Sequence, residues 1–145
     1  MSTLASLDIL ISKRGQGAIS AVEILQLLFI KGWNATNNGK ILYLPLGDDD
    51  DFDWQEQQLS ISELLNIVSQ KEKQGEIIGV GVTWESTMIG GTLLIHSNCS
   101  LSFSLTINRK QLVSNITDVS WYLERILPCF ETDTTIVEKF TFSQD

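Results

Sequence analysis

The chain has little cysteine and proline, few basic residues and no long apolar run. Only 2 Cys and 2 Pro occur in 145 residues, which excludes a disulfide framework and a zinc site built on several cysteines. Lys and Arg number 10 against 18 Asp and Glu, so a general nucleic-acid binder, which needs a surplus of positive charge, is excluded too. With 43% apolar residues, the composition instead indicates one folded, acidic domain spanning residues 1–145.

Targeting and membrane segments are also missing from the sequence pattern. The first 14 residues have no basic region before an apolar stretch, unlike a signal peptide. The longest apolar run is interrupted by Gln26 and Lys31 and falls short of the roughly 20 residues that span a bilayer. We therefore expect a cytoplasmic protein with no membrane contact, in which Cys99 and Cys129 are free thiols.

Three segments carry helix signals. Ser20 with Glu23 and Ser60 with Glu63 each have the spacing of a capping box, and apolar residues follow each at helical intervals up to a glycine, Gly32 or Gly75. The third helix is predicted to begin near Thr117, where the charge of Asp118 suits a helix N-terminus, and Pro128 is expected to limit its extent.

Alternating apolar and polar residues predict about six strands between and around these helices. An alternating strand buries one face and exposes the other, as in an antiparallel sheet covered on one side. The expected fold is α+β, with the element order β-α-β-α-β-β-β-α-β and the helices on one face of a largely antiparallel sheet. The predicted strands are residues 7–11, 40–46, 79–85, 91–96, 101–108 and 136–142.

The net charge is concentrated in one place. The stretch from Ile41 to Gln70 holds seven acidic residues and no Lys or Arg, so the other 115 residues carry only −1 of the total of −8. Concentrated charge produces a field in one direction, and the mutual repulsion of the acids favours a partner that relieves it. The densest part, 48–56, contains the candidate binding residues Asp48, Asp49, Asp50, Asp51, Phe52, Asp53, Trp54 and Glu56.

Four interpretations of this acidic stretch compete. It could be a solvated turn before the second helix, a loose calcium or magnesium site, a carboxylate cluster for metal-assisted phosphoryl chemistry, or a protein-binding surface. An EF-hand is rejected because Trp54 stands where the turn glycine belongs and Ser60 where the bidentate acid belongs. In the protein-binding interpretation, Phe52 and Trp54 supply apolar anchors within a charged rim. The alternative is that one or both of these aromatic residues fold back into the core.

Catalytic signals are few. The only histidine, His96, lies three residues before Cys99, and a Cys–His pair can form a thiolate nucleophile. No third orienting group is apparent, so structural roles for both are the simpler interpretation, and Cys129 is expected to pack at a helix end. The sequence contains no GxGxxG, Walker, HExxH or GxSxG motif. We expect no enzymatic activity, no cofactor and no resident metal.

Taken over the whole chain, the sequence resembles the bacterial immunity proteins that neutralise polymorphic toxins, including those of contact-dependent growth inhibition systems. The resemblance is carried by the acidic loop 48–53 with Trp54, the alternating strand from Val80 to Trp84, and the helical segment Trp121-Tyr122-Leu123-Glu124-Arg125. It implies a non-enzymatic inhibitor that covers the active site of a basic toxin domain, in particular a nuclease, with an acidic surface. No residue role transfers from these diverse families, so the expected contacts rest on the charge argument alone.

Two further functions stay open at this point. The chain could be an adaptor or structural subunit that binds a basic protein unrelated to toxins, or a small cation-binding domain. A hydrolase that uses His96 and Cys99 ranks behind them. The partner's identity, the oligomeric state and the strand order are not determined by the sequence.

Overall fold

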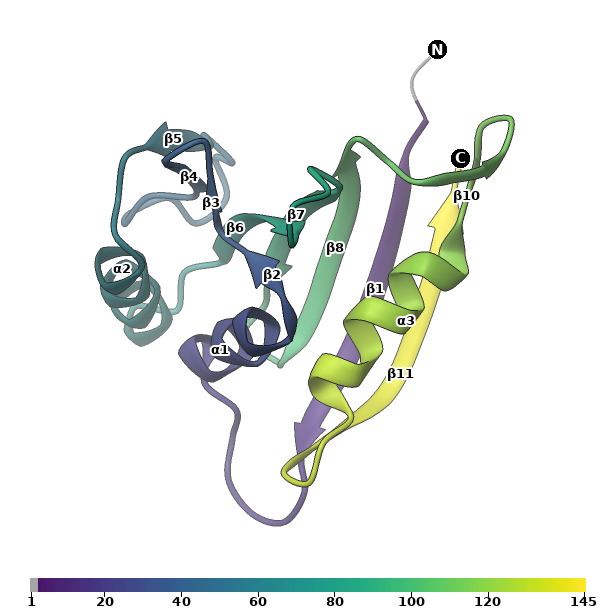
Figure 1. The fold of residues 1–145 in the computed structure, drawn as a ribbon. Helices are drawn as coiled ribbons and strands as arrows, with labels where there is room; N and C mark the ends of the chain where they lie inside the picture. The colour runs from purple at the N-terminus through teal and green to yellow at the C-terminus, as the bar shows by residue number, and fades with distance from the viewer. Residues whose placement is uncertain (1–2) are drawn as a thin grey trace.

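The computed structural model describes residues 3–145 and shows an α+β fold (Figure 1). A large antiparallel sheet has the strand order β11-β1-β8-β7-β6-β4-β3, with β2 paired to β6 and β5 paired to β4. The long strands are β1 (Ala5–Lys13), β6 (Ile78–Trp84), β7 (Gly90–Ile95), β8 (Ser100–Ile107) and β11 (Thr135–Gln144), together with the shorter β4 (Lys40–Tyr43). The expected fold class and the order of these elements are confirmed.

The three helices begin where the sequence predicts. Helices α1 (Ala21–Lys31) and α2 (Ile61–Lys73) are capped by Ser20 and Ser60, and both capping boxes are complete. Helix α3 (Val119–Phe130) is capped by Asp118. Pro128, which was expected to limit this helix, lies inside its last turn, and the helix ends two residues later at Phe130. A proline there removes a single backbone hydrogen bond, and its exposed position leaves the freed carbonyl in reach of water.

The core lies between the sheet and the helices. Helices α1 and α3 lie in front of the sheet in Figure 1, and α2 lies beside α1 towards the β4–β6 end. The inward positions of β1 and β8 are buried, whereas their outward positions are more accessible. Trp33 lies at the centre of this core, with its ring edge-on to Trp84, Phe103 and Trp121 and its indole N–H donated to the Arg125 carbonyl.

Five short strands were not predicted. They are β2 (Trp33–Asn34), β3 (Thr36–Asn37), β5 (Gln55–Gln57), β9 (Gln111–Val113) and β10 (Ile116–Thr117). Strands of two or three residues are too short to show alternation, so their pairing depends on what the tertiary fold places beside them. The last two form a separate hairpin before α3, and β5 brings the acidic stretch alongside β4.

The two glycines within β6 leave one face of this strand without side chains at their positions. Val80 and Val82 face the helices, so Gly79 and Gly81 face the opposite side. A Cβ atom on Gly79 would lie 2.6 Å from the Trp54 ring and 2.7 Å from Leu44, and one on Gly81 would lie 3.0 Å from Leu42. The chain from β4 to β5 therefore packs closely against these glycines. This contact fixes the start and the end of the acidic loop against the sheet.

Candidate functional site

The acidic loop, defined here as residues 48–53, is organised around the side chain of Asp48. This carboxylate is only 6% exposed. Its Oδ1 accepts the backbone N–H groups of Asp51 (3.1 Å) and Phe52 (3.0 Å), and its Oδ2 accepts that of Asp53 (2.8 Å). Three N–H donors from consecutive residues hold the loop in one tight turn. The structure thus gives Asp48 an internal role, and its oxygens are engaged within the loop.

A buried lysine supports the loop from beneath. Lys71 of α2 is 1% exposed. Its Nζ donates to the carbonyl oxygens of Pro45 (2.7 Å) and Asp48 (2.6 Å) and lies 3.2 Å from Oε1 of Glu76. All three protons of the ammonium group therefore have acceptors, which a buried charge requires. The buried positive charge of Lys71 on α2 therefore stabilises the acidic loop.

Two carboxylates tie the loop to the segment after α2. Oε1 of Glu76 accepts the Gly47 N–H at 2.8 Å, in addition to the lysine. Oδ1 of Asp49 accepts the Ile77 N–H, also at 2.8 Å. These contacts span about 30 residues of sequence and join the start of the loop to the segment that follows α2. The loop is consequently a fixed part of the fold.

Phe52 and Trp54 take different positions. Phe52 is 46% exposed, with φ +54°, in the left-handed region that bulky residues seldom adopt. The hydrogen bonds from the loop to Asp48 hold that strained conformation in place. Trp54 is half-buried, with its ring against Gly79 and Leu44. The fold-back considered for the aromatic residues therefore applies to Trp54, and Phe52 is presented to solvent.

Five of the predicted acidic residues are exposed: Asp49, Asp50, Asp51, Asp53 and Glu56. Among residues 3–145, none of the five forms an ion pair. Glu56 is separated from the others on β5, where it lines a small hollow of about 50 Å³ together with Lys40. The loop thus gathers Asp49, Asp50, Asp51 and Asp53 around Phe52 in the chain, with Asp48 beneath and Glu56 to one side.

The sequence reasoning missed Lys71 and Glu76. Leu64, Val68 and Lys71 are spaced at i, i+4 and i+7, so the lysine falls on the buried stripe of α2. A lysine on an apolar stripe beside a run of unpaired acids is the signal that could have identified it. Glu76 lies beyond the helix and offers no comparable pattern.

The other chemical candidates are separated from one another. Nε2 of His96 lies 3.1 Å from Oγ of Ser102, whereas the Cys99 thiol is directed to the Ile19 carbonyl at 3.7 Å. In the described part of the chain, no hydrogen bond joins the two side chains. Cys129 is buried, as expected, and burial raises the pKa of its thiol to about 12. Within residues 3–145, no group of three or more His, Cys, Asp or Glu side chains is arranged to hold a metal ion.

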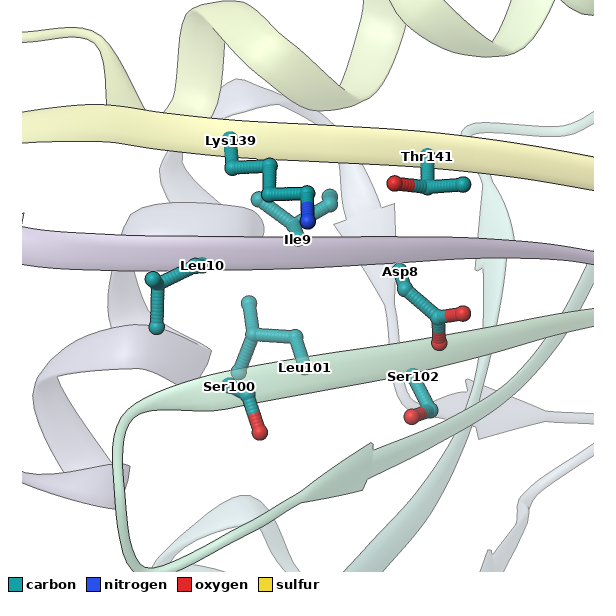
Figure 2. Close-up of a pocket in the computed structure, with 8 residues that line it drawn as sticks. All are labelled: Asp8, Ile9, Leu10, Ser100, Leu101, Ser102, Lys139 and Thr141. Carbon is teal, nitrogen blue, oxygen red and sulfur yellow. The ribbon is translucent and has the colours of Figure 1, made fainter.

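A shallow hollow of about 330 Å³ lies on the sheet face opposite the helices. Figure 2 shows Asp8, Ser100, Ser102 and Lys139 at this outer surface, drawn from β1, β8 and β11. Cross-strand pairing places Asp8 between Ser102 and Thr141. The hollow contains one carboxylate and one ammonium group, and it is remote in strand order from the acidic loop at β4 and β5.

Comparison with family models, curated proteins and solved structures yields no match. Among the described residues, no helix has both the length and the apolar character needed to cross a bilayer.

Proposed function

We propose that this protein is a non-enzymatic immunity protein that binds a basic toxin domain, specifically a nuclease, and masks its active site with the acidic loop. The observation that carries the proposal is the set of exposed carboxylates on a loop held by buried Lys71 and Asp48. The resemblance described above supplies the class of partner, and the charge and geometry of the loop supply the mode of contact.

The charge distribution supports electrostatic capture. Asp49, Asp50, Asp51 and Asp53 are exposed without an ion pair among the described residues. A groove that binds phosphates must be basic, and carboxylates can occupy it in place of the nucleic acid. Complementary charge raises association rates towards ~10⁸–10⁹ M⁻¹ s⁻¹ at low salt. Such a rate suits an inhibitor that must reach the toxin before it acts.

The rigidity of the loop supports affinity. Ordering a mobile loop when a partner binds costs conformational entropy and so lowers affinity. Here the contacts of Asp48, Lys71 and Glu76 fix the backbone before any partner binds. Exposed Phe52 then provides an apolar centre within the charged rim, the arrangement that interface hot spots favour.

The experiment is capture of the toxin followed by an activity assay. The full chain is immobilised, exposed to lysate of the source organism at low salt, and washed with rising salt. We expect a basic protein to elute at high salt, to degrade nucleic acid when free, and to lose that activity when the chain is added back. A basic partner without nuclease activity would favour an adaptor instead, and the absence of a basic partner would contradict both functions.

A further inference from the structure

Strand β11 forms one edge of the sheet and, within residues 3–145, pairs only with β1. At its end, the Asp145 N–H donates to the Leu4 carbonyl at 2.8 Å and therefore points towards β1. Alternation along the strand then directs the backbone N–H and C=O groups of every second residue away from β1. These residues are Phe140, Phe142 and Gln144. Their groups present a template for one more strand.

The other end of β11 is closed to such pairing. The Val137 N–H, which also points away from β1, donates to Oε1 of Glu131 at 3.0 Å. The pairing register with β1 shifts between Leu10 and Ile11, which leaves Glu138 as a bulge. The hydrogen bond to Glu131 and the bulge at Glu138 both hinder pairing with a further strand, and both lie before Lys139 in the chain. The open part of the edge is therefore residues 139–145.

A hollow with both apolar and charged walls lies beside the closed end, on the helix side of the sheet. Its volume is about 460 Å³; Leu127 of α3 with Val137 and Phe140 of β11 form its apolar part, and Glu131, Glu138 and Lys139 complete the lining. Phe140 is paired with buried Ile9, so it faces the helices, yet it is 47% exposed because α3 leaves this part uncovered. The hollow therefore exposes apolar side-chain surface beside the edge of the sheet.

An apolar projection lies beside the other end of the same strand. The hairpin of β9 and β10 exposes Leu112 (69%), Val113 (59%) and Ile116 (54%). Its base is held to β11, because the Thr117 N–H donates to Oε1 of Gln144 and the Gln144 side chain donates to the Asn115 carbonyl. Figure 1 shows this hairpin extending beyond the sheet near the C-terminus. The chain thus carries a projection and a hollow at opposite ends of one free edge.

We propose that the free edge of β11 binds a second copy of this chain, antiparallel, about a two-fold axis perpendicular to the sheet at Phe142. In this register Phe142 faces its own symmetry mate, Phe140 faces Gln144, and Lys139 faces Asp145. The outward backbone groups of each strand then form six main-chain hydrogen bonds. Because Gln144 holds the hairpin, the apolar projection of each copy lies beside the hollow of the other.

Symmetry and charge favour this register over the axes at residues 139, 140 and 141. A two-fold axis of this kind requires one residue to face itself, since opposed side chains share a face of the sheet. An axis at Lys139 would oppose two ammonium groups, which is unfavourable. An axis at Phe140 would bring the bulge at Glu138 into the ladder. An axis at Thr141 would leave Lys139 opposite Ser143, with no acidic partner.

A second copy fits better than an unrelated strand because each chain carries both the exposed apolar hairpin and the hollow beside Phe140, so the hairpin of one copy can pack on the hollow of the other. The dimer leaves the acidic loop free, since the loop lies at the opposite end of the strand order. The inference does not depend on the proposed function, and its test requires no toxin.

The first measurement is the mass of the purified chain by sedimentation from about 1 to about 200 µM. We expect the mass to rise from the 16.2 kDa of one chain to twice that value over this range, which corresponds to a dissociation constant on the order of micromolar. Phe140→Ser and Leu112→Ser should each raise the dissociation constant by about tenfold or more. The control, Ile30→Ser, changes an apolar residue that is 78% exposed on α1 and should leave the mass unchanged.

A disulfide test fixes the register. Thr141 and Ser143 face each other across the axis on the outer face, so a mixture of T141C and S143C chains, with Cys99 replaced by Ser, should form a disulfide-linked dimer under mild oxidation. Neither variant alone should do so, because its own thiols lie farther apart than a disulfide spans. Lys139→Glu should weaken the dimer about tenfold by opposing two acids, and adding Asp145→Lys should restore it.

Three results would overturn the proposal. They are a monomer throughout the concentration range, a dimer insensitive to both Phe140→Ser and Leu112→Ser, and a cross-link in T141C alone. Thermal unfolding of each variant shows whether the monomer still folds, so that loss of the dimer is distinguished from loss of the fold.

Discussion

Replacing Lys71 with Met removes the ammonium group beneath the acidic loop while keeping an unbranched apolar side chain only one atom shorter. The ammonium group donates to two backbone carbonyls and to Glu76. A hydrogen bond to a charged group contributes about 1.5–3 kcal/mol, and breaking a buried pair by removing one partner costs about 3–5 kcal/mol. Glu76 keeps 12% side-chain exposure, so water relieves part of its loss. We expect the free energy of unfolding to fall by about 3 kcal/mol.

Urea unfolding followed by circular dichroism measures this change, with Lys73→Met as the matched control. Lys73 is exposed on the same helix, so its replacement should change the free energy of unfolding by less than about 0.5 kcal/mol. Hydrogen exchange supplies a local measurement: the N–H groups of Asp51, Phe52 and Asp53, bonded to Asp48, should exchange faster in Lys71→Met.

Two results would refute this reasoning about the loop. One is a loss below about 1 kcal/mol in Lys71→Met, since a buried ammonium group with three acceptors cannot be so easily replaced. The other is a large loss with unchanged exchange at the three amides, which would show that Lys71 stabilises the helix alone.

Two further predictions concern the packing around the site. Gly79→Ala places a Cβ 2.6 Å from the Trp54 ring and should lower the free energy of unfolding by about 1–3 kcal/mol. Gly81→Ala, whose Cβ would lie 3.0 Å from Leu42, should lower it by less. Equal losses in the two variants would contradict the packing described. Ellman's reagent at pH 8 should modify Cys129 only after unfolding, because burial raises the pKa of that thiol from 9.0 to about 12. Above about pH 9 the thiol of Cys129 ionises in the unfolded chain while it stays protonated in the native protein. The free energy of unfolding should therefore decline between about pH 9 and pH 12. An equal decline in a Cys129→Ala variant would exclude this thiol as the cause.

The parts of the fold that depend on nearby residues were predictable from the sequence. A capping box involves residues three apart, so Ser20 with Glu23 and Ser60 with Glu63 identify two helix starts without reference to the fold. Alternation likewise reveals β8, whose inward and outward positions differ clearly in burial. The strands of two or three residues carry no such signal, because their partners are chosen by the tertiary structure.

The acidic loop shows where sequence reasoning stops. Four consecutive aspartates look alike in the sequence, yet the first turns inward because its carboxylate reaches the N–H groups three to five residues ahead. The difference between Phe52 and Trp54 likewise depends on Gly79, which lies 25 residues beyond Trp54 and leaves space for one aromatic ring. Composition located the charge, whereas the turn around Asp48 and the contact of Trp54 with Gly79 determine which residues of the acidic stretch face solvent.

The most direct test of the proposed acidic interface is the rate at which the captured partner binds, measured against ionic strength by stopped flow. The variant is Asp50→Asn, Asp51→Asn and Asp53→Asn together. The control carries the same change in charge at exposed sites elsewhere: Glu85→Gln, Glu124→Gln and Asp133→Asn.

Removing charges from the loop should slow association at low salt by about tenfold or more and flatten its dependence on salt, since steering acts through charges at the contact. The control should retain most of the rate and of the slope. Equal behaviour of the two variants would contradict the account, because binding would then depend on net charge and not on the acidic loop.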